Sequence, residues 1–225
     1  MDKYDSSIET YEHIERVAFY LGRIIEALKS DADRAILEDE LSLENVTLVD
    51  LLCVLRYGGE IPAYSDLFKA IMRNSIDYLK TYHKTDFMTS EQLLNYYIQE
   101  LEERGKNHDK SKLESPEKEG YDVFKPALKS VPYGSPEYQK YLAQMQDVVK
   151  HHYLCNRHHP EHFDNGIYGM NIMDLIEMLC DWKAASERYG GCDFIESLGT
   201  TNKERFNLDD AMVSVLKNTA IKYFA

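Results

Sequence analysis

Apolar residues recur at three- and four-residue spacing along most of the chain, a pattern typical of amphipathic helices. It predicts helices over about residues 6–29, 65–82, 90–105, 135–155, 171–189 and 207–223. The apolar run over 46–57 has no decisive period and predicts either a helix or a strand. The segment 113–135 is rich in proline and glycine, so we expect a loop-rich connector with a short helix near 121–129. The pattern predicts an all-α fold.

Local capping signals place the ends of the helix over 90–105. Thr89 followed three residues later by Gln92 has the spacing of a capping box, which starts a helix. Gly105 fits a stop at the C-terminal end. The residues that follow, 107–112, are therefore expected just past the end of this helix.

Composition and charge exclude two classes of partner. The chain has 225 residues, of which 44% are hydrophobic and 29% charged, as in ordinary globular proteins, but its net charge is −13. Long nucleic acids and anionic membranes both require a basic face, so we expect neither as a partner. No apolar run approaches the roughly 20 residues that a membrane-spanning helix needs. Composition does not define the oligomeric state.

The cysteines indicate a reducing compartment. The chain has four of them with no Cys-x-x-Cys pair, at Cys53, Cys155, Cys180 and Cys192. The N-terminal residues 1–10 are polar and acidic, unlike a signal peptide. We therefore expect free thiols and a cytoplasmic protein.

The segment Asn107-His108-Asp109-Lys110-Ser111-Lys112 contains the pair that organises the candidate chemistry. His108 and Asp109 place an imidazole nitrogen beside a carboxylate oxygen, and divalent metal ions accept both donors. A His-Asp pair alone is common, so the prediction depends on further donors elsewhere in the chain.

A histidine cluster over 151–162 supplies such donors. It contains five histidines at the end of a predicted helix, namely His151, His152, His158, His159 and His162. We expect one member of each adjacent pair to face the core. We choose His152, which ends the apolar stripe of its helix, and His159, seven residues later. Arg157 is placed to clamp a phosphate if it points inward. The alternative is an exposed polar loop.

Two further candidates lie on helices. His83 extends the apolar stripe of the helix over 65–82, although such a histidine is more often a core or capping residue. Asp181 shares one face of the helix over 171–189 with Asp174 and Glu177, spaced i, i+3 and i+7. This face either supplies metal ligands or is a solvated acidic surface. Glu177 itself either orients a metal-bound histidine or is solvated. His13 has no comparable context and is not predicted as a ligand.

The order His, His-Asp, His cluster, Asp resembles the HD-domain superfamily of metal-dependent phosphohydrolases. The resemblance implies an all-helical bundle that holds one to three divalent ions. It implies His83, His108, Asp109 and Asp181 as the minimal ligand set, with His152 and His159 as additional ligands. Some members extend the pair to His-Asp-x-Gly-Lys with the lysine near the phosphate. Lys112 occupies that position here, while Ser111 replaces the glycine.

A second resemblance covers about residues 81–220. The stretches HDKSKL, HHYLCNRHHPEHF and MDLIEMLCDWKAAS are similar to an uncharacterised family of phage and bacterial proteins. We therefore expect an HD-like metal-binding helical domain over 81–225. Residues 1–80 are expected to form an N-terminal helical extension that packs on this domain.

These resemblances predict a metal-dependent phosphohydrolase for a nucleotide or another small phosphate ester, with Mn, Fe, Zn, Ni or Mg as the divalent ion. Asp109 would orient the attacking water and accept its proton. Lys112 and Arg157 would neutralise charge on the phosphate oxygens. One alternative is a di-iron enzyme that activates dioxygen through a similar ligand set. Another is a non-catalytic metal- or nucleotide-binding protein that modulates a phage host.

Overall fold

The computed structural model describes residues 4–30, 41–58, 64–83, 88–132, 135–189 and 193–224. The side chains of residues 82–83 and 188–189 lie outside this description. All regular elements in the described ranges are helices, which confirms the predicted all-α fold. No helix in these ranges is long and apolar enough to cross a membrane.

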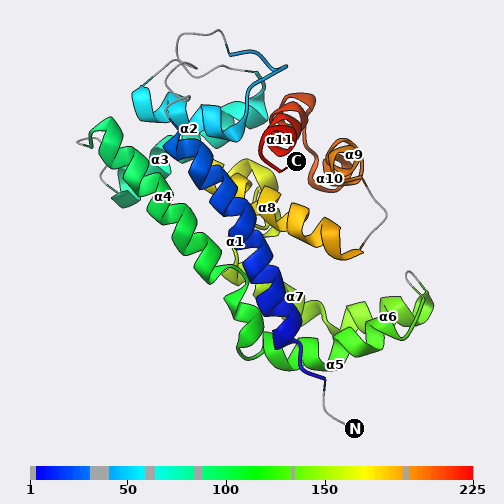
Figure 1. Cartoon of the computed structure of the whole chain (residues 1–225). Helices are drawn as coiled ribbons and strands as arrows, with labels where there is room; N and C mark the ends of the chain where they lie inside the picture. Colours follow the sequence, from blue (N-terminus) through cyan, green and yellow to red (C-terminus); the bar gives the residue numbers. More distant parts are fainter. Residues whose placement is uncertain are drawn as a thin grey trace.

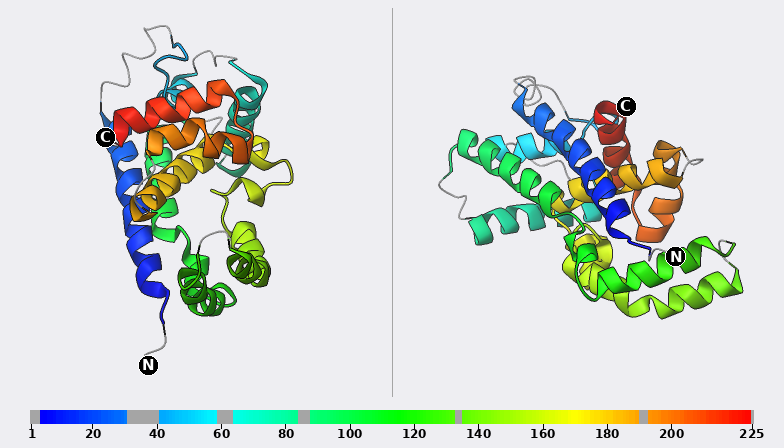
Figure 2. Two further views of the ribbon diagram at one scale, coloured as in Figure 1. Left: turned by 90° about the vertical axis from the view of Figure 1, so that its right-hand side faces the viewer. Right: turned by 60° about the horizontal axis from the view of Figure 1, so that its bottom comes forward.

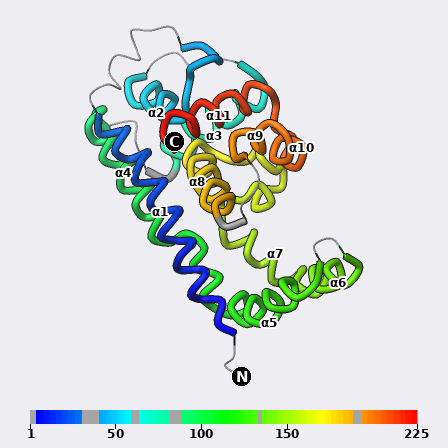
Figure 3. The backbone as a smooth tube through the Cα atoms, turned by 45° about the vertical axis from the view of Figure 1, so that its right-hand side comes forward, coloured from blue at the N-terminus to red at the C-terminus, as the bar shows by residue number. Residues whose placement is uncertain are grey.

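Three long helices form the frame of the fold. α1 (Ser7–Lys29) packs along both α4 (Ser90–Asn107) and α8 (Ile172–Tyr189). Figures 1 and 3 show α1 beside α4 over much of its length. A Cβ atom on Gly105 would lie 3.3 Å from Leu21 Cδ1, so this glycine permits the close approach of α1 and α4. The helix continues past Gly105 to Asn107, two residues beyond the predicted stop.

The hydrophobic core continues across the predicted boundary at residue 80. α2 (Leu48–Tyr57), α3 (Asp66–His83) and α11 (Asp210–Tyr223) contribute buried residues to the same cluster as α1, α4 and α8. The ambiguous run over 46–57 is therefore a helix, which starts at a capping box between Thr47 and Asp50. The N-terminal segment and the predicted metal-binding domain thus share one core.

The helices α5 (Glu117–Lys129), α6 (Pro136–Gln144) and α7 (Gln146–Cys155) lie to one side of this frame (Figures 1 and 2). The predicted helix over 135–155 is divided into α6 and α7 at Met145, a buried residue between the two. The short helices α9 (Phe194–Gly199) and α10 (Thr201–Phe206) were not predicted and precede α11.

Candidate metal centre

The centre begins where α4 ends. His108 is the C-cap of α4, and Asp109 adopts a left-handed conformation with φ 54°. Aspartate and asparagine tolerate this conformation better than most residues because their short polar side chains bond locally. The short 3₁₀ helix η3 (Lys110–Leu113) then turns the chain away. Both His108 and Asp109 are only 1% exposed, so the pair lies inside the protein.

The carboxylate of Asp109 lies between two groups of imidazoles. Its Oδ2 atom is 3.7 Å from Nε2 of His108 and 3.8 Å from Nε2 of His13. Its Oδ1 atom is 3.4 Å from Nε2 of His152 and 3.6 Å from Nε2 of His158. One carboxylate can therefore serve two groups of nitrogen donors.

We define the first group as His13, His108 and Asp181. His13 comes from α1, and its Nε2 atom lies 2.8 Å from Oδ1 of Asp181 on α8. Nε2 of His108 lies 3.7 Å from the same oxygen. The close packing of α1 on α4 and α8 brings these donors together.

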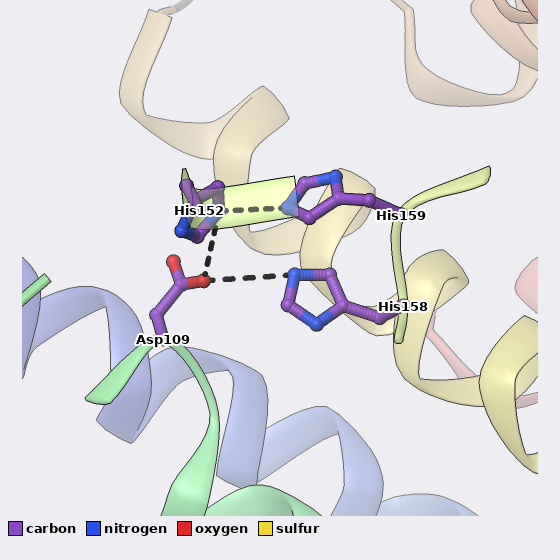
Figure 4. A group of neighbouring side chains, drawn as sticks. All are labelled: Asp109, His152, His158 and His159. Atoms are coloured by element: carbon purple, nitrogen blue, oxygen red, sulfur yellow. Dashed lines mark hydrogen bonds and ion pairs between the residues drawn. The ribbon is translucent and has the colours of Figure 1, made fainter. Parts of the chain in front are cut away.

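We define the second group as His152, His158 and His159. These histidines and Asp109 each present one donor atom, and the four atoms lie within 4.8 Å of one another. His152 lies near the end of α7, and the other two lie in the turn before η4 (Pro160–His162). Figure 4 shows the three rings around the Asp109 carboxylate, with Nε2 of His152 2.8 Å from Nε2 of His159.

Buried carboxylates behind the two groups hold the rings in place. Glu177 on α8 lies 2.9 Å from Nδ1 of His108 and 3.2 Å from Nδ1 of His158. Glu117 on α5 lies 2.9 Å from Nδ1 of His152. Because a carboxylate accepts the Nδ1 proton, the Nε2 atom of each ring is directed toward Asp109, as metal-binding histidines require. Glu177 is thus not solvated, and Arg104 also donates to it at 2.9 Å.

The residues of both groups fit a divalent cation. Among the buried atoms of the described residues, Nε2 of His108, Nε2 of His158 and Oδ1 of Asp109 have no hydrogen-bond partner. Burying such an atom without a partner costs about 1–3 kcal/mol. A cation that accepted these lone pairs would remove that cost, and nitrogen and carboxylate oxygen are donors for Zn, Mn, Fe and Ni.

The carboxylates of the centre are ionised. Burial acts to raise the pKa of Asp109, but Lys112 and His108 hold that pKa well below its ordinary value. Burial acts in the same direction on Asp181, and hydrogen bonds from His108 and His13 keep its pKa well below the ordinary value. Both side chains therefore carry the charge that metal coordination needs.

Most of the imidazoles are neutral. Burial lowers the pKa of His13 and of His152, and it lowers the pKa of His159 to about 2 with the help of His158. His108 is different, because the surrounding carboxylates outweigh the effect of burial and raise its pKa to about 10. Metal binding in the first group must therefore displace a proton from His108.

Two basic residues were predicted beside the metal. Lys112 lies there, with its Nζ atom 2.5 Å from Oδ2 of Asp109. Arg157 instead forms a two-point ion pair with Asp174, at 2.9 and 3.2 Å, and stacks over the ring of Phe163. The charge of Arg157 is thus directed to a buried carboxylate outside both groups, which does not fit the predicted phosphate clamp.

The structure brings together five of the predicted ligands, namely His108, Asp109, His152, His159 and Asp181. The side chain of His83 lies outside the described residues. His83 is the last residue of α3. The next helix, α4, has 18 residues and is therefore about 27 Å long. His108 follows the far end of that helix.

Sequence reasoning missed two donors, His13 and His158. His13 occupies a buried position of α1, in step with Val17, Tyr20 and Ile24 on the inward face. This helical spacing was the one signal that could have identified it. His158 was passed over because only one residue of an adjacent pair was expected to face the core. That expectation is wrong here, because both His158 and His159 lie in an irregular turn.

A family model described as a family of unknown function (DUF5662) matches residues 78–222. The matched region contains both groups and their supporting carboxylates, with the exception of His13. No curated protein and no solved structure matches the chain.

Proposed function

The chain belongs to the DUF5662 family, whose function is unknown, and we propose that it is a metal-dependent phosphohydrolase acting on a nucleotide or another small phosphate ester. The observation that carries the proposal is the position of Asp109. Its two oxygens face separate groups of buried imidazoles. A carboxylate between two sets of donors is the arrangement that two-metal hydrolases use.

The proposal assigns ligands to two ions. His13, His108, Asp181 and one oxygen of Asp109 would hold the first, and the second group with the other oxygen of Asp109 would hold the second. We thus place His13, and not His83, as the first histidine of the HD-like pattern. The ions would supply Lewis-acid neutralisation of charge on a phosphoryl group. The many nitrogen donors favour Fe, Zn or Ni over Mg.

Residues of the chain would bind and orient the substrate. The Lys112 ammonium, 2.5 Å from Asp109 and 21% exposed, can donate to a phosphate oxygen that enters the centre. Asp109 would also orient the attacking water. Because the net charge is −13, a small phosphate held by local cations suits this protein better than a long polynucleotide. Arg157 has no part in the proposal, since Asp174 holds its guanidinium.

The first experiment is elemental analysis of the tag-free protein before any chelator is added. We expect the two groups together to hold about two equivalents of transition metal per chain. Asp109→Asn should lose most of this metal, because it removes the shared charged ligand. Asp164→Asn, at an exposed position of the same residue type, should keep it. The samples then enter a screen of phosphate monoesters, diesters and nucleotides with and without oxygen.

Each outcome of this experiment distinguishes among the functions considered. Metal together with phosphate release that is lost in Asp109→Asn supports the hydrolase. Iron with turnover only in oxygen would replace it by dioxygen chemistry. Bound metal without turnover of any ester would favour a metal-binding protein. Full metal content in Asp109→Asn would contradict the assignment of the centre itself.

A further inference from the structure

A second cluster of metal-type donors lies on the outward side of α7, and none of its residues is a proposed ligand of the inner centre. We call Glu117, His151 and Cys155 the outer triad. One donor atom from each of the three residues lies within 4.8 Å of the others. His151 and Cys155 are four residues apart on α7 and therefore share one helix face. Glu117 faces them from α5.

The outer triad combines one fixed donor with two accessible ones. The Glu117 carboxylate is fully buried, with Oε1 2.8 Å from Nδ1 of His151 and Oε2 2.9 Å from Nδ1 of His152. The side chain of His151 is 39% exposed, and Cys155 is exposed. A small solute can therefore reach the imidazole and the sulfur, while the buried carboxylate stays in place.

We propose that the outer triad binds a divalent cation that accepts sulfur, with Zn²⁺ as the natural choice. The sulfur of Cys155 is 3.7 Å from each ring nitrogen of His151. In a tetrahedral zinc site the Zn–S distance is about 2.3 Å and the Zn–N distance about 2.0 Å. The sulfur and the nitrogen of such a site are therefore about 3.5 Å apart. The sulfur and the imidazole therefore need little movement to share one ion. Mg²⁺ and Mn²⁺ prefer oxygen donors and fit the set poorly.

The outer triad shares a carboxylate with the inner centre. Glu117 faces the outer triad with Oε1 and orients His152 of the second group with Oε2. Carboxylates that orient metal-bound histidines change metal affinity by about 10–100-fold when they are altered. An ion in the outer triad therefore contacts a group that supports the inner centre, so the two sites are coupled.

A nucleophilic thiol is the main alternative role for this cluster. Burial and the carboxylates of Glu117 and Glu114 raise the pKa of Cys155. Reactive thiols have a lowered pKa, since the thiolate is the nucleophile. The surroundings of Cys155 are therefore not those of an activated nucleophile.

The test uses Co²⁺ as a coloured substitute for Zn²⁺ in the full-length protein. The protein is stripped with a chelator, kept reduced with a phosphine and titrated with Co²⁺. A thiolate ligand gives a near-ultraviolet charge-transfer band, whereas the two inner groups contain only nitrogen and oxygen donors and give none. We expect the band in the wild type and its disappearance when Zn²⁺ is added.

Two variants and a control identify the residues that give rise to the charge-transfer band. Cys155→Ser should abolish it, and His151→Gln should weaken Co²⁺ binding at this site by at least about tenfold. Leu154→Ser, at the neighbouring exposed position of α7, should keep the band unchanged. Circular dichroism of each variant verifies that the helices are retained.

Two results would overturn the proposal. The first is a wild-type protein without a charge-transfer band at saturating Co²⁺. The second is a band that survives in Cys155→Ser, because another cysteine would then be the ligand. Neither result bears on the phosphohydrolase, since the metal content and turnover of the inner centre are measured separately. Conversely, loss of the inner metal in Asp109→Asn should leave the sulfur band in place.

Discussion

Asp109 is the single residue on which the centre depends. Its left-handed backbone turns the chain at the end of α4 and presents the carboxylate to donors on both sides. The sequence identified the His108-Asp109 pair because two metal-type donors stand next to each other. The pair alone could not indicate that each oxygen of Asp109 faces a different group, since that depends on where α1 and α7 lie.

Lys112 offers the clearest single-residue test of catalysis. Replacing it with Met keeps the length of the side chain and removes the charge 2.5 Å from Asp109. If the proposed function holds, we expect Lys112→Met to retain metal and to lose about 10²–10³-fold in kcat, because the charge that we propose to face the phosphate is removed. Steady-state kinetics on the ester found by the screen measures this effect.

The matched control for this test is Lys110→Met on the same 3₁₀ turn. Lys110 is exposed and donates to Asn107, so its replacement should leave kcat unchanged. Equal rates for the two variants would show that Lys112 has no role beyond its pairing with Asp109.

Among the helices, α1 contributes more than was predicted. Residues 1–80 were expected to be an extension, yet α1 carries His13 into the first group. The imidazole lies 2.8 Å from Asp181, so its loss removes a nitrogen donor and leaves that carboxylate with one neighbour fewer. The contribution of α1 can therefore be tested at one position.

We expect His13→Gln to lose about one equivalent of metal per chain, because only the first group includes this residue. His162→Gln is the control, since His162 contacts the backbone of Tyr153 and lies outside both groups. Elemental analysis of the two purified variants provides the measurement. If His13→Gln holds as much metal as the control, the role of α1 is packing alone.

An ion pair ties α1 to α8 and has a defined pH dependence. Arg16 and Tyr20 on α1 both donate to Glu187 on α8. The Arg16 hydrogen bond, opposed by burial and assisted by Tyr20, lowers the pKa of Glu187 from 4.5 to about 2. A folded-state pKa below the unfolded one means that the stabilisation is present above about pH 4.5 and is lost as the pH falls toward 2.

We expect Glu187→Gln to lower the free energy of unfolding at pH 7 by at most about 1 kcal/mol, because the pair is partly exposed and screened. The difference from the wild type should shrink between pH 4.5 and pH 3, because the carboxyl of the unfolded chain takes up a proton there while the native carboxyl is still ionised. Urea unfolding at a series of pH values measures it. Glu26→Gln, which removes an exposed i, i+3 partner of Lys29, should show no such trend. A difference that stays constant with pH would contradict the ionic explanation.

For the fold as a whole, a metal ion in the candidate centre should hold distant segments of the chain together. Its donors come from α1, α4, α7, α8 and the connecting turns, so an ion that binds only the native state stabilises their arrangement. At a metal concentration about 100 times Kd the gain is about 2.7 kcal/mol. For a chain of this length we expect chelation to lower Tm by about 5–10 °C.

Calorimetry with and without a chelator measures this change. Asp109→Asn serves as the control, because a protein that has lost the inner metal should show a smaller change of Tm on addition of the chelator. A wild-type Tm that does not move on removal of bound metal would show that the centre adds nothing to folding stability.

The features that could be predicted from the sequence are those that depend on residues close together along the chain. Helical periodicity and capping act over three or four residues, so the sequence located α1, α3, α4 and α8 within a residue or two of their observed ends. The Thr89–Gln92 capping box is present as predicted. His152 and Asp181 were found because they continue inward helix faces or match a known order of donors. Such signals establish which side of a helix faces inward.

Packing between distant helices determined which of the buried side chains meet in the candidate centre. His13 and Asp181 are 168 residues apart and meet because α1 packs on α8, which no local pattern specifies. The pairing of Arg157 with Asp174 likewise depends on where the turn before η4 meets α8. Periodicity shows that a side chain is buried, but the identity of its neighbours depends on which buried faces come into contact.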